Sequence, residues 1–150
     1  MLETIFRKID EHYDEFVQLR RYLHERPELS FQEYKTAKFI ADYYKDLHIP
    51  VQTNIGGNGV IATLKGDLPG KTIALRADFD ALPIQDEKDV PYKSKVPGVM
   101  HACGHDAHTA TLLVLAKIIA PYKAKLKGTL VFLHQHAEEL PPGGAISIVE

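Results

Sequence analysis

The spacing of apolar residues changes at Pro50, and no other feature of the sequence limits the fold as strongly. Before Pro50 the apolar residues recur at helical intervals, first over residues 5–23 and again over residues 31–47, which predicts two amphipathic helices. After Pro50 the chain turns to short runs rich in β-branched residues, with glycine-rich segments between them, a pattern typical of strands. These predicted strands cover residues 51–55, 60–64 and 72–77.

Two polar signals mark helix starts within this pattern. Ser30 and Glu33 match a capping box, which predicts that the second helix begins at Ser30. Asp106 is the expected cap of a further helix that ends near Ala120, and a buried strand is predicted from Gly128 to His134. Because helices alternate with strands of buried character, we predict an α/β fold in which a mixed, largely parallel sheet is flanked by helices.

Length and composition are those of one globular domain. The chain has 150 residues, 45% hydrophobic and 25% charged, and its net charge is -2. Its Lys and Arg residues are scattered, so we expect neither nucleic acid nor an acidic membrane as a partner. The charged amino terminus is unlike a secretory signal, no run is apolar enough for a membrane span, and a single cysteine allows no intrachain disulfide. We therefore expect a cytoplasmic protein.

Residue types that bind metals gather between residues 101 and 136. Five of the eight histidines lie there, together with the only cysteine, Cys103. Cys103 and His105 are two residues apart, and Gly104 lets the backbone turn between them, so both side chains could bind one ion. Nitrogen and sulfur ligands favour zinc and its neighbours. The alternative is an unreactive buried cysteine beside histidines that bind only protein groups.

Acidic residues follow two of the predicted strands. Asp78 and Asp80 come directly after one strand, and Glu138 and Glu139 follow another. Since open α/β sheets place their sites beyond the carboxyl ends of strands, these carboxylates could meet the 103–105 loop at one rim. One adjacent glutamate could then coordinate a metal while the other takes a proton from water. The alternative for the glutamate pair is a solvated loop.

Three long motifs give the sequence a family resemblance. They are Arg76–Pro83, Met100–Asp106, and Ala137–Glu139 followed by Pro142–Gly144, and they occur in this order. With them the chain resembles the amidohydrolase branch of the aminoacylase and carboxypeptidase G metallopeptidase family, which includes hippurate hydrolases and N-acyl-L-amino-acid amidohydrolases. The likeness extends from the first predicted helix, through residues 23–30, to the last residue.

The resemblance implies a role for each matching residue. Cys103, His105 and Glu139 would be ligands of a two-metal centre, with manganese, zinc, cobalt or nickel as the ions. Glu138 would be the general base, and Asp80 would orient the site. The reaction implied is hydrolysis of the amide bond of a small-molecule N-acyl amino acid, which gives a carboxylic acid and a free amino acid.

The resemblance also implies a larger architecture. Residues 1–150 would be the amino-terminal part of a catalytic domain like that of zinc exopeptidases, incomplete as it stands. A smaller domain that forms a lid and mediates dimerisation would lie outside these residues, so a homodimer is expected of the complete enzyme. A catalytically inactive piece with at most a partial metal site is the alternative for the 150 residues alone.

The sequence departs from the family at two places that bear on the site. Related branches have His-x-Asp where this chain has Asp78-Phe79-Asp80, and we therefore give Asp78 no ligand role. His136 stands where proline is common, so it is expected either at the surface or behind the site. A different enzyme class stays open as well, in which Cys103 is a nucleophile activated by His105 or His101.

Overall fold

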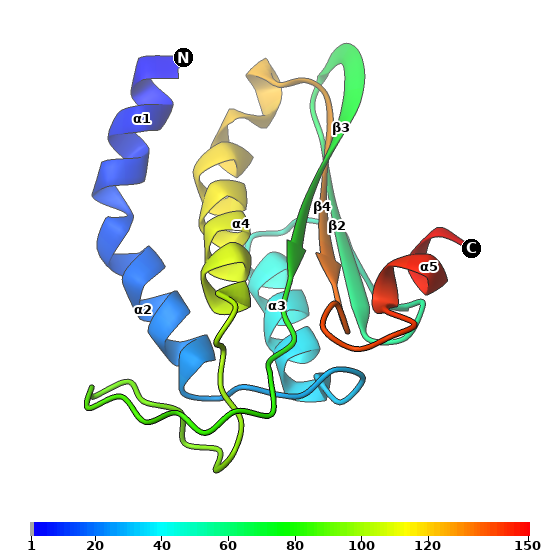
Figure 1. Cartoon of the computed structure of the whole chain (residues 1–150). Coiled ribbons are helices and arrows are strands. Elements are labelled where there is room, and N and C mark those ends of the chain that lie inside the picture. The colour runs from blue at the N-terminus through cyan, green and yellow to red at the C-terminus, as the bar shows by residue number, and fades with distance from the viewer. Residues whose placement is uncertain (1) are drawn as a thin grey trace.

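A computed structural model describes residues 2–150 as five α-helices, one 3-10 helix and four strands (Figure 1). The helices are α1 (Leu2–Glu11), α2 (Tyr13–His24), α3 (Tyr34–Asp46), α4 (His105–Ile119), η1 (Ala120–Lys125) and α5 (Gly144–Val149). The strands are β1 (Val51–Ile55), β2 (Gly59–Lys65), β3 (Leu68–Asp78) and β4 (Lys127–Gln135).

The four strands form one sheet in the order β1-β2-β4-β3. β4 pairs antiparallel with β2 and parallel with β3, and β1 pairs antiparallel with β2. The parallel pair follows from the crossover through α4, because parallel neighbours need a long connection. The predicted α/β fold with a mixed sheet is confirmed, although only one of the three pairings within residues 2–150 is parallel.

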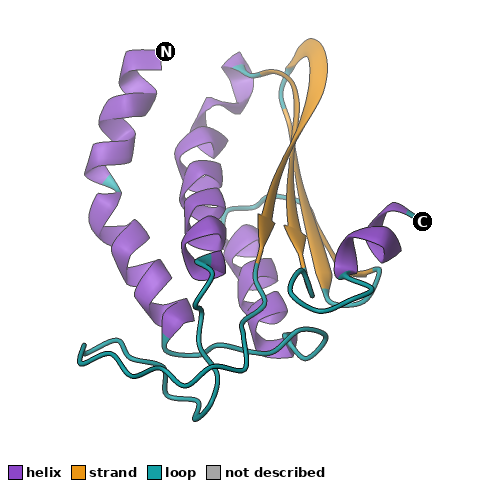
Figure 2. Ribbon diagram, in the orientation of Figure 1, coloured by secondary structure: helices purple, strands orange, loops and turns teal. Residues whose placement is uncertain are grey.

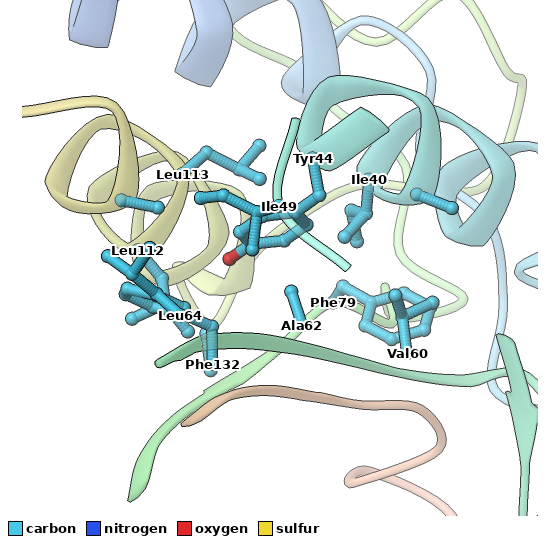
Figure 3. Close-up of a cluster of buried hydrophobic side chains, with 13 residues drawn as sticks. Ile40, Tyr44, Ile49, Val60, Ala62, Leu64, Phe79, Leu112, Leu113 and Phe132 are labelled. Carbon is cyan, nitrogen blue, oxygen red and sulfur yellow. The ribbon is translucent and has the colours of Figure 1, made fainter. Parts of the chain in front are cut away.

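Helices cover one face of the sheet, and α5 lies against the other face beside the end of β4 (Figure 2). α3 and α4 pack directly on the strands, and α1 and α2 lie outside α4. The core between these layers contains inward-facing residues that alternate along β2 and β4 (Figure 3). Its fully buried members include Ile40, Tyr44, Val60, Leu113 and Phe132.

The first helical segment is divided in two. It was predicted as one helix over residues 5–23, but His12 interrupts it between α1 and α2. None of the helices in the described part of the chain is both long and apolar enough to cross a membrane.

The predicted capping box is wrong. α3 begins at Tyr34 and its N-cap residue is Glu33, whose side chain makes no cap hydrogen bond. The Glu28 carboxylate accepts the first-turn amides of Lys35 and Thr36 instead. The hydroxyl of Ser30 donates to Asp80, and the carboxylate of Glu33 accepts the amide of Ala137 instead. Both polar groups find partners in the segments that follow β3 and β4, and these hydrogen bonds replace the local cap.

Not every predicted strand is buried. β3 and β1 are the edges of the sheet within residues 2–150, and Ile73 on β3 is 55% exposed. β4, by contrast, lies between two neighbours, which confirms the prediction of a buried strand at 128–134. Because β3 and β4 are parallel neighbours, the segments that follow them leave the sheet side by side, at the carboxyl ends of the two strands.

Candidate metal centre

Three segments bring the predicted site residues together at one rim of the sheet. β3 leads to Asp80, the parallel strand β4 leads to Glu138 and Glu139, and the loop before α4 carries Cys103. One donor atom from each of Cys103, His105 and Glu139 lies within 4.8 Å of the other two. The rim is the place where open α/β sheets position their sites.

Gly104 sets the direction of the two ligand candidates on the loop. Its φ of 97° is left-handed, a conformation that glycine adopts at no steric cost, and α4 begins at the next residue, His105. The prediction that Asp106 caps this helix is wrong, because Gly104 occupies the N-cap position. Cys103 therefore stays on the exposed loop, and His105 is buried in the first turn of the helix.

Asp80 orients the ring of His105. The Nδ1–H group of His105 donates to the Asp80 carbonyl oxygen at 2.9 Å and to its Oδ1 at 3.1 Å. With the proton on Nδ1, Nε2 is left unprotonated, and it lies 3.5 Å from Asp78 Oδ1, 3.7 Å from Glu139 Oε1 and 3.8 Å from Glu138 Oε2. Burial lowers the pKa of His105, but the hydrogen bond to Asp80 and the charges of Asp78 and Asp80 raise it overall.

Asp80 is held from several sides. It is 1% exposed, and its Oδ2 accepts the Ser30 hydroxyl at 2.7 Å and the Glu139 amide at 2.9 Å. Burial by itself raises the pKa of the Asp80 carboxyl, but hydrogen bonds outweigh it and keep this pKa well below the usual range. The donors are the His105 ring, the Glu139 amide, the Ser30 hydroxyl and the Glu138 amide.

Glu139 and Cys103 have the chemistry of an ion-binding pair. Glu139 Oε1 is buried without a hydrogen-bond partner in the described part of the chain. The Glu139 carboxylate raises the pKa of the Cys103 thiol, and burial and the charges of Glu138 and Asp78 add to this. A thiol sulfur, an imidazole nitrogen and an unpartnered carboxylate oxygen form a donor set that fits a divalent transition-metal ion.

A second cluster shares His105 with the first. Asp78, His105 and His108 also offer donor atoms within 4.8 Å of one another. His108 Nδ1 donates to Asp78 Oδ1 at 2.7 Å, and Arg76 contacts Asp78 Oδ2 at 3.1 Å. Both oxygens of Asp78 therefore already have N–H or cationic partners. Since His105 Nδ1 donates to Asp80, both clusters would have to use the same His105 atom, Nε2. The sequence offered one signal for His108, which is its position three residues after His105 on one helix face.

A family model described as peptidase family M20/M25/M40 matches residues 74–150. The chain belongs to this family. The Bacillus subtilis (strain 168) protein YhaA is 61% identical over 148 residues, which are 99% of this chain and 37% of YhaA. The N-acyl-L-amino acid amidohydrolase of Geobacillus stearothermophilus is 48% identical over 153 residues, 99% of this chain and 40% of that enzyme.

The fold is similar to a solved member of the M20 family. The crystal structure of YxeP from Bacillus subtilis, described as a dinuclear metal binding peptidase, superposes with a TM-score of 0.86 at 44% identity. The match covers 93% of this chain and 39% of YxeP. The chain therefore spans about two fifths of the length of these relatives.

In this M20 chain a buried polar network supports the start of α4. His24 Nδ1 contacts Asp106 Oδ2 at 2.7 Å, and Arg20 Nε contacts the same oxygen at 2.9 Å. On its other side, His24 Nε2 lies 3.3 Å from Asp86 Oδ2. Since Asp106 follows His105, this network anchors the helix turn that carries the imidazole. Its members come from three distant segments, so sequence spacing could not reveal it.

His136 lies behind the strand ends, and the expectation of a surface position is wrong. Its side chain is 1% exposed, its ring centre lies 5.9 Å from that of Phe31, and it fills the space beside Gly57. A Cβ on Gly57 would lie 2.8 Å from His136 Nε2, so only glycine fits this turn. His136 therefore belongs to the packing between β4 and the β1–β2 turn.

Proposed function

We propose that the complete protein hydrolyses the amide bond of N-acyl amino acids in a metal-dependent reaction. One observation supports this most directly: Cys103, His105 and Glu139 each offer a donor atom within 4.8 Å of the other two at the rim of the sheet, and Glu139 Oε1 is buried without a hydrogen-bond partner within residues 2–150. The substrate class rests on the similarity to the Geobacillus amidohydrolase and on the motifs described above. The products would be a carboxylic acid and a free amino acid.

Cys103, His105 and Glu139 would hold the metal. We propose two divalent ions per chain, as named for YxeP, with manganese, zinc, cobalt or nickel as candidates. The remaining ligands would come from the longer protein, because the relatives are more than twice as long as this chain. When bound, such ions supply Lewis acidity, which polarises a carbonyl group and lowers the pKa of water.

Glu138 is the proposed general base. Oxygens of both glutamates lie near His105 Nε2, at 3.8 Å for Glu138 and 3.7 Å for Glu139, but the Glu138 side chain is 40% exposed and that of Glu139 is 20% exposed. The more exposed Glu138 can therefore reach a water molecule and a substrate, whereas Oε1 of Glu139 is buried without a hydrogen-bond partner within residues 2–150. In the proposed reaction Glu138 takes a proton from water and returns it to the leaving amine. Asp80 keeps His105 in the tautomer whose Nε2 is free to bind.

The rest of the enzyme is proposed from the family. A smaller lid and dimerisation domain would lie outside residues 1–150, and the complete enzyme would form a homodimer in the cytoplasm.

Catalysis by a Cys103 nucleophile is disfavoured by the site's electrostatics. Nearby carboxylates raise the pKa of this thiol, whereas a cysteine nucleophile needs a lowered one.

The test uses the complete natural protein and three variants. After loading with manganese or zinc and desalting, the wild type should retain two ions per chain and hydrolyse N-acetyl or N-benzoyl amino acids. Cys103→Ala should lose metal, and Glu138→Gln should keep metal but lose nearly all turnover. Glu3→Gln, the same change at an exposed position on α1, is the matched control and should behave like the wild type. Normal metal binding by Cys103→Ala, or hydrolysis by Glu138→Gln, would contradict the assigned roles.

A further inference from the structure

Ala137, the residue before the two site glutamates, has an unusual backbone. Its φ is 48°, in the left-handed region that residues with a Cβ rarely adopt, and it is fully buried. Its carbonyl oxygen accepts the Gly144 amide at 2.9 Å, and its own amide donates to Glu33 Oε1 at 2.8 Å. Hydrogen bonds on both sides therefore maintain a conformation that alanine by itself disfavours.

Glu33 is a buried carboxylate with no counter-charge among the described residues. It is 0% exposed, and its other oxygen, Oε2, accepts Asn58 Nδ2 at 2.9 Å. Within residues 2–150 it has no ion-pair partner, and it does not cap α3, although it occupies the N-cap position. Burying a carboxylate against amides alone is unfavourable compared with burying an apolar side chain. The stability of the fold therefore does not explain why this buried position holds a glutamate.

We propose that Glu33 is a positioning residue for the metal centre, an inference that rests on the proposed roles of Glu138 and Glu139. By holding Ala137 in the left-handed conformation, Glu33 sets the direction in which the chain leaves β4. This direction allows the Glu139 amide to reach Asp80 at 2.9 Å and turns the Glu139 side chain toward His105. Without an Oε1 acceptor at residue 33, Ala137 relaxes toward extended backbone and this arrangement is lost.

Three variants of Glu33 separate positioning from packing. Glu33→Ala removes the acceptor, and Glu33→Asp keeps the charge but withdraws it by one methylene. Glu33→Gln keeps an Oε1 acceptor for Ala137, and the Asn58 amide can turn its own oxygen toward the new NH2 group. Glu28→Ala is the matched control. The Glu28 carboxylate accepts the amides of Lys35 and Thr36 and the Thr36 hydroxyl at the start of α3, and it makes no hydrogen bond to β4 or Ala137.

The first readout is hydrogen exchange, followed by mass spectrometry on a peptide of the complete protein that contains Ala137. Glu33→Ala should speed exchange of the Ala137 amide by about 10-fold, since one hydrogen bond is lost. Glu33→Asp should act in the same direction, and Glu33→Gln and Glu28→Ala should resemble the wild type. Should Glu33→Ala fail to fold, the comparison of Asp with Gln still decides the outcome. Unchanged exchange at Ala137 in the Ala and Asp variants would overturn the proposal.

The second readout is cobalt affinity, measured by competition with a chelator. Glu33→Ala and Glu33→Asp should weaken cobalt binding by about 10-fold or more, as expected when the support of a metal ligand is removed, and Glu33→Gln should restore it. Faster exchange at Ala137 with unchanged cobalt affinity would overturn the positioning role but leave the proposed function intact. A wild type that binds no cobalt would overturn the proposed function, and the exchange data would still decide whether Glu33 holds Ala137.

Discussion

Acidification should destabilise the fold through His134, a histidine in the core. His134 is 0% exposed on β4, and its Nε2 accepts the Tyr44 hydroxyl at 2.8 Å. Its Nδ1 has no hydrogen-bond partner among residues 2–150. Burial lowers the pKa of His134 to about 3, because a charged imidazole loses its hydration there. In the unfolded chain the pKa returns to about 6.5.

The size of the effect follows from these two pKa values. Between pH 6.5 and pH 3 the unfolded chain binds a proton that folded His134 does not bind, so the free energy of unfolding falls as the pH falls. Each pH unit in this window costs about 1.4 kcal/mol. From pH 7 to pH 5 the loss is about 2 kcal/mol, a large part of the 5–15 kcal/mol that is typical of a domain.

The assay is urea unfolding, followed by circular dichroism at pH 7 and pH 5, of the wild type and His134→Gln. Glutamine keeps an acceptor for Tyr44 but does not titrate. The loss of stability between the two pH values should therefore be about 2 kcal/mol smaller in the variant. His48→Asn, at an exposed position with φ 56° that asparagine tolerates, is the control and should show the wild-type loss. An equal pH dependence in His134→Gln and wild type would refute the reasoning.

Two further substitutions test the site and the core. Asp80→Asn should weaken metal binding by about 10- to 100-fold in a chelator competition. The reason is that an amide NH2 group cannot accept hydrogen bonds from the Ser30 hydroxyl and the Glu139 amide. Unchanged affinity would show that Asp80 does not orient the site. Phe132→Ala should lower the free energy of unfolding by about 3–5 kcal/mol in urea titrations, since this ring is fully buried between the sheet and α3. A loss below about 1 kcal/mol would mean that neighbouring core residues fill the cavity left by the ring.

The sequence alone predicted most of the regular structure. The runs that became β1, β2 and β4 were recognisable because apolar and β-branched residues report the burial of a strand directly. The same reasoning placed the carboxylates at strand ends and set Cys103 beside His105. These features depend on neighbours in the chain, which the sequence displays.

Only the tertiary structure decided where the polar groups of the 30–33 turn bind. Ser30 and Glu33 form a capping box in sequence, but a cap and a distant hydrogen bond each contribute about 1 kcal/mol, so local spacing cannot choose between them. The choice depends on whether Asp80 and Ala137 arrive beside the turn, and the strand order determines that. The edge position of β3 and the network around His24 have the same origin. Periodicity in the chain is a local property, whereas the partners of a buried polar group come from segments that meet only when the chain has folded.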